Sequence, residues 1–333
     1  MGASIISLLL LCVVPDAAPA QATLDARSGR YEVIGLHDWT LPQLLDSLAA
    51  HDASLTSQTC AVTLRQSLGF PDVSVVLYPA GHGGRPTKFF EIMVLEPGDS
   101  ARSRLLPRPA DSLPPSDRWA DIALLLRQNN NLFGFLLTHP EALYSAEPVD
   151  SLLRRSPDTE RMRLNLAAMD VEAAVEPALQ AFLGDRNLAN LMPALLVLGS
   201  PRSGPAGERA LAQLLRHPFN FFAMGAADLL AYRLRTDGTP VNWAPLTPDI
   251  AAVLDGTNLF ALDRVMELLR AVPPPTADGR RMVMGGGRML LSRMAAADSI
   301  TRTEAHALLM QLTGEQLPPD PARWATVLAV EWP

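Results

Sequence analysis

Three stretches of 21 residues align without a gap and repeat one apolar pattern: ALQAFLGDRNLANLMPALLVL (Ala178–Leu198), ALAQLLRHPFNFFAMGAADLL (Ala210–Leu230) and DIAAVLDGTNLFALDRVMELL (Asp249–Leu269). Seven aligned positions are apolar in all three: Leu179/Leu211/Ile250, Phe182/Leu214/Val253, Leu183/Leu215/Leu254, Leu191/Ala223/Leu262, Ala194/Ala226/Val265, Val197/Leu229/Leu268 and Leu198/Leu230/Leu269. Spacings of three and four residues place each group on one face of a helix. Each stretch therefore predicts two consecutive helices with apolar faces.

A single helix pair cannot bury such faces, so we expect neighbouring pairs to stack. The stretches begin 32 and 39 residues apart. In pattern and period they resemble the HEAT/armadillo-like α-solenoid superfamily, and looser helix pairs extend the resemblance over about residues 116–333. Pro177 fits a usual repeat position in one copy, but Asp185-Arg186 has no counterpart in the others. The resemblance implies binding along a concave face and carries over no catalytic residues.

The first 22 residues have the features of a secretory signal peptide. The apolar run Ile5–Val14 is too short to span a bilayer, and Ala20-Gln21-Ala22 fits a cleavage site after Ala22. Met1–Ser4 contains no basic residue, and Cys12 lacks the preceding small residue of a lipid-anchoring motif. We expect an exported, periplasmic or extracellular protein without a membrane span in the mature chain. An uncleaved anchor and a buried N-terminal helix are the alternatives.

Residues 23–96 predict a small α+β unit. After a polar lead, we expect a strand at Tyr31–Leu36, a helix capped by Thr40, a second helix at Ser54–Leu68, and a β-hairpin over residues 73–95. The hairpin strands, Val73–Tyr78 and Phe89–Leu95, are almost continuously apolar, which predicts that both sheet faces are covered. The Gly-rich segment Gly81–Gly84 leads into a strand, so we interpret it as a flexible hairpin loop and not a phosphate-binding loop.

Residues 97–116 are rich in proline and predict an extended, solvated linker. Residues 117–333 then predict the HEAT-like α-solenoid. The fold class expected for the whole chain is mainly α, with the solenoid preceded by the small α+β unit.

Charge and cysteine content narrow the function classes. A net charge of −7 over 333 residues argues against a general nucleic-acid binder, which would carry a basic stripe. Cleavage of the signal peptide would leave Cys60 as the one cysteine, so no internal disulfide is expected. We interpret Cys60 as a small buried side chain, with an intermolecular bridge or a nucleophile as alternatives.

His51-Asp52 is the strongest candidate for catalysis. Together with His37 and a later carboxylate such as Asp121, it resembles the ligand set of the HD-type metal-dependent phosphohydrolases, in which His and Asp side chains hold divalent metals. The separation from His37 to His51 is short for that arrangement. A histidine at the C-terminal end of a helix is also favourable in its own right.

The expected function is that of an exported binding or scaffold protein. It would act through the helical-repeat surface on a protein partner and would need no cofactor, metal or catalytic residue. The alternative is a metal-dependent hydrolase centred on His37, His51 and Asp52. A third hypothesis is that the helices serve as a spacer for the N-terminal unit.

Overall fold

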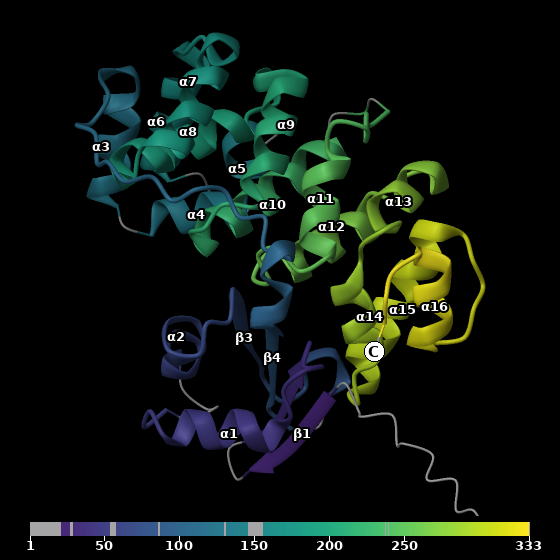
Figure 1. Cartoon of the computed structure of the whole chain (residues 1–333). Coiled ribbons are helices and arrows are strands. Elements are labelled where there is room, and N and C mark those ends of the chain that lie inside the picture. Colours follow the sequence, from purple (N-terminus) through teal and green to yellow (C-terminus); the bar gives the residue numbers. More distant parts are fainter. Residues whose placement is uncertain are drawn as a thin grey trace, which may run out of the picture.

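The computed structural model describes residues 21–26, 29–53, 58–85, 87–129, 131–145, 156–236, 238 and 240–332. In this part the chain is mainly helical, with a small mixed sheet near its N-terminus (Figure 1). The expected signal peptide, residues 1–22, lies outside the described residues except for its last two. Gln21 and Ala22 belong to the first strand, so cleavage after Ala22 would remove two residues from that strand.

The sheet has four strands: β1 (Gln21–Ala26), β2 (Gly29–Ile34), β3 (Asp72–Tyr78) and β4 (Phe89–Leu95). Their order is β1-β2-β4-β3; β2 runs parallel to β4, and the other two pairings are antiparallel. The hairpin formed by β3 and β4 confirms the sequence prediction. The polar lead was not predicted as a strand, but β1 lies in it and pairs with β2 along its whole length.

Side chains alternate between the two faces of the central strands. Val33 and Ile92 point into an apolar cluster with α1 (Leu41–Ala49) and α2 (Gln58–Gln66), where Cys60 is buried as expected. Ile34 and Met93 belong to the large core of the helical part. Both faces are therefore covered, as the apolar strands predicted. The second cover comes from helices some 200 residues further along the chain, α14 and α15, which lie beside the sheet in Figure 1.

The helices of the remaining chain are α3 (Ala120–Gln128), α4 (Leu132–Thr138), α5 (Glu141–Tyr144), α6 (Pro157–Ala168), α7 (Val171–Gly184), α8 (Leu188–Gly199), α9 (Gly204–Leu214), α10 (Asn220–Thr236), α11 (Thr247–Leu254), α12 (Leu262–Ala271), α13 (Thr276–Val283), α14 (Arg288–Met294), α15 (Ser299–Thr313) and α16 (Pro321–Leu328). Many begin at a side-chain cap, for example Asp170 before α7 and Asn187 before α8. Among the described residues, none of these helices is both long and apolar enough to cross a bilayer.

The three aligned stretches form the pairs α7/α8, α9/α10 and α11/α12. Within each pair the helices touch, and contacts continue along two rows, from α7 through α9 and α11 to α13 and from α8 through α10 to α12. All repeated apolar positions are buried except Leu179 and Leu183, which are partly buried and pack against the same core. Residues chosen for one shared pattern thus lie in one continuous core.

The proline-rich segment is extended and mostly exposed to solvent, as predicted, but it packs along the helices and does not hang free. It begins as a short 3-10 turn, η2 (Pro97–Arg102), and then crosses the helices in extended form (Figure 1). The Leu106 N–H donates to the Arg216 carbonyl at 2.8 Å, and the Leu113 N–H donates to Asp185 at 2.9 Å. The non-proline residues of the segment have backbone N–H groups that need acceptors, and acceptors on the helical part supply them.

Candidate functional site

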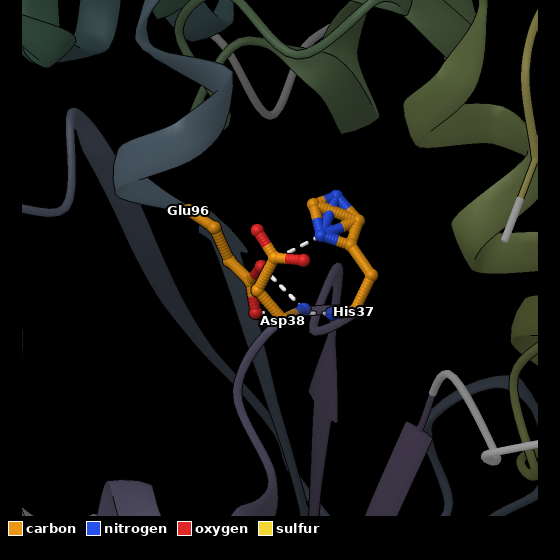
Figure 2. Close-up of side chains that lie close together, drawn as sticks. All are labelled: His37, Asp38 and Glu96. Carbon is orange, nitrogen blue, oxygen red and sulfur yellow. Dashed lines mark hydrogen bonds and ion pairs between the residues drawn. The ribbon is translucent and has the colours of Figure 1, made fainter.

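The best-defined polar cluster lies where the parallel strands β2 and β4 end at the same sheet edge. His37 follows β2, and Glu96 directly follows β4. The Glu96 carboxylate accepts the backbone N–H groups of His37, Asp38 and Trp39 at 3.0, 2.8 and 3.0 Å. Its Oε2 also lies 2.6 Å from His37 Nδ1, and Figure 2 shows the imidazole directed toward this cluster. One buried carboxylate thus fixes the whole turn after β2.

The second ring nitrogen of His37 is also engaged. His37 Nε2 lies 2.7 Å from Asp99 Oδ2, at the start of the proline-rich segment. The hydrogen bond with Glu96 raises the pKa of His37, with burial opposing the shift and the Asp99 charge adding to it. Burial opposes ionisation of Glu96, but hydrogen bonds from His37 and the backbone lower its pKa. These directions describe an imidazolium held between two carboxylates.

His37, Asp38 and Glu96 are also a possible metal site, because they offer one ligand atom each within 4.8 Å of one another. A histidine ligand needs a free nitrogen lone pair, and both nitrogens of His37 contact carboxylates. Asp38 is exposed, and its carboxylate accepts no hydrogen bond from the described residues. A metal would have to displace the Glu96 or Asp99 contact, so the observed geometry is that of an ion-pair network.

A cavity of about 940 Å³ opens beside this cluster and is bounded by the proline-rich segment and α14. Three arginines converge there on Asp255, which follows α11. Arg102 donates through Nε and Nη2 to the Asp255 carbonyl, while Arg104 and Arg288 each lie 3.4 Å from its carboxylate. Arg102 also binds Asp99 at 2.8 Å. Charged side chains line the cavity, but they are largely bound to one another, and these ion pairs join the sheet edge to the helices.

The residues proposed from the sequence do not come together. His51 and Asp52 lie exposed at the end of α1, where His51 Nδ1 bonds the Ser47 carbonyl at 2.9 Å and Asp52 has a positive φ of 54°. Asp121 is exposed in the first turn of α3. Among the described residues, only His37 of the four belongs to a group of possible metal ligands. The HD-type set is therefore not assembled in this fold.

The partners of His37 were missed because they lie 59 and 62 residues away in the chain. A usable signal existed. His37 and Glu96 each follow an apolar strand, and side chains that follow neighbouring parallel strands meet at one sheet edge. Strands β2 and β4 were both predicted from the sequence, but their parallel pairing was not. Comparisons of the chain with protein-family models, curated proteins and solved structures gave no match.

Proposed function

We propose that this chain is an exported, non-enzymatic binding or scaffold protein that holds a protein partner on the outer surface of a HEAT-like helical stack. The observation that carries the proposal is the ordered succession of contacts from α7 to α13. Helices α8 and α10 also contact α3 and α4, so the row formed by α7, α9 and α11 offers the outer face to a partner. Such faces bind through shape and apolar area and need no special motif.

The contacts beside the cavity argue against a catalytic role for His37 and Glu96. A general base or a metal ligand needs an available lone pair, but His37 is held at both nitrogens and Glu96 accepts four hydrogen bonds. Arg102 is likewise bound to Asp99 and Asp255. We interpret this network as the junction that fixes the sheet against the helices.

The test is isolation of the full-length protein from its own cells, with quantification of co-purifying protein and of divalent metal. Two variants make the result specific. Leu188→Asp places a charge on an exposed apolar position of the stack, and His37→Ala opens the ion-pair network. We expect a stoichiometric protein complex in the extracellular or envelope fraction that survives His37→Ala and is weakened at least tenfold by Leu188→Asp. A stoichiometric metal that is lost in His37→Ala together with a hydrolytic activity would refute the proposal.

A further inference from the structure

A second cavity, of about 390 Å³, lies between the proline-rich segment and the helical stack and opens to solvent. The segment contributes Arg108 and Pro109 to one wall. The turn before α8 and the connection from α9 to α10 form the opposite walls.

The lining combines a buried apolar floor with an exposed apolar rim. Leu191 and Phe222 are buried, whereas Leu188 and Phe219 remain 48% and 51% exposed. Large apolar side chains left in water beside a cavity favour an apolar ligand, because covering them gains roughly 25 cal/mol for each Å² buried. The cavity is large enough to hold one large apolar side chain.

His217 adds an aromatic ring to this floor. Its side chain is almost fully buried, and the rings of Phe182 and Phe222 pack against it in edge-to-face geometry. The Phe219 N–H donates to Nδ1 at 3.1 Å, and burial lowers the pKa of His217, so the neutral ring carries its hydrogen on Nε2. Nε2 is buried and has no hydrogen-bond partner among the described residues. The ring therefore forms part of the floor, while Nε2 itself does not reach the cavity surface.

The mouth of the cavity is positively charged. Arg108 and Arg186 are exposed there, and neither forms an ion pair in the described part of the chain. Asp185 lines the same cavity, but its oxygens accept hydrogen bonds from Leu113, Asn187 and Asn190. Its charge is therefore already stabilised by three donors, which leaves two guanidinium groups for an anion. Guanidinium groups match a carboxylate well.

We propose that this cavity binds the carboxyl-terminal residue of a partner polypeptide when that residue has a large apolar side chain. The side chain fills the floor beside Phe222, and the terminal carboxylate meets Arg108 and Arg186 at the mouth. The preceding residues of the partner then cross Leu188 and Phe219. This inference rests on the proposed binding function and names the part of the partner that is recognised.

The test uses the full chain and a fluorescent hexapeptide that ends in Leu-Phe, with a free carboxylate or with a carboxamide. We expect the free carboxylate to bind at least tenfold more tightly, and its Kd to rise with salt. The double variant Arg108→Ala/Arg186→Ala should lose at least tenfold in affinity. Arg209→Ala, at an exposed arginine of α9 outside the cavity, is the matched control and should bind as the wild type does.

Leu188→Asp is a second, separate variant at the exposed rim of the cavity. It adds a negative charge where the partner chain would cross, and we expect at least tenfold weaker peptide binding with an unchanged melting temperature. Equal binding of the amide, unchanged binding by the double arginine variant, or tighter binding of 3-phenylpropionate than of the peptide would each overturn the inference. If the peptide does not bind the wild type, or if the native complex persists unweakened in the double variant, this inference fails and the proposed function stands.

Discussion

Arg293 Nη2 of α14 lies 3.4 Å from Glu91 Oε1 of β4, and both side chains are buried. The Thr301 hydroxyl donates to the same carboxylate at 3.0 Å, and Asp263 of α12 contacts the Arg293 guanidinium on its other side. This ion pair joins the sheet to the C-terminal helices across 202 residues of sequence. Both charges were removed from water, so each depends on the other for its stabilisation.

We expect Arg293→Met to destabilise the protein strongly. Methionine can fill much of the arginine volume, but Glu91 would then remain buried without its cation. Breaking a buried pair in this way costs about 3–5 kcal/mol. Urea unfolding at pH 8 measures the loss. The exposed Arg281→Met on α13 is the control, and an equal small effect in both variants would contradict the assignment of Arg293 as a buried partner.

The same pair predicts a pH dependence. Burial raises the pKa of Glu91 to about 7, despite the opposing charge of Arg293. A folded-state pKa above the unfolded value favours the protonated form in the fold, so this contribution is complete below about pH 4.5 and is lost as the pH rises through about 7. Glu91→Gln cannot titrate. Between pH 5 and 8, its free energy of unfolding should therefore fall less than that of the wild type, as measured by urea unfolding at several pH values; parallel curves would disprove the assignment.

The spacing of apolar residues was sufficient to predict the helices and the hairpin, because the periods of 3.6 and 2 residues can be recognised among residues that are close in sequence. It failed for β1, whose residues Gln21–Ala26 carry few apolar side chains and become a strand through pairing with β2. It also failed for the polar contacts, since Glu91 within β4 and Glu96 directly after it are single charged residues with no local pattern. Their partners, His37 and Arg293, are set by strand order and by the return of distant helices to the sheet.

Removal of Glu96 tests whether the sheet-edge cluster is structural. Glu96→Ala leaves three backbone N–H groups without their acceptor, so we expect a loss of about 2–4 kcal/mol in the free energy of unfolding. Asp38→Ala is the matched control, because the Asp38 carboxylate accepts no hydrogen bond within the described ranges. It should change stability by less than about 0.5 kcal/mol.

Metal titration of the wild type, Glu96→Ala and Asp38→Ala tests whether the sheet-edge cluster is a metal site. A metal held jointly by His37, Asp38 and Glu96 would stabilise the wild type and would be lost in both variants. We expect no shift in the melting temperature of the wild type with Zn²⁺ or Mn²⁺ at micromolar concentration. A shift that Asp38→Ala abolishes would identify a metal site and contradict the ion-pair interpretation.

Leu214 tests the apolar pattern from which the fold was predicted. It is fully buried in α9 and occupies the same repeated position as Phe182 and Val253. Leu214→Ala should cost about 2–5 kcal/mol through lost burial and the cavity left behind. Leu164→Ala in α6 removes the same atoms from a side chain that is 53% exposed, so we expect a much smaller loss. Leu214→Asp buries an unpaired charge between stacked helices and should abolish cooperative unfolding, measured by circular dichroism during thermal denaturation. A soluble Leu214→Asp variant with a sharp transition would show that the three aligned stretches do not share one core.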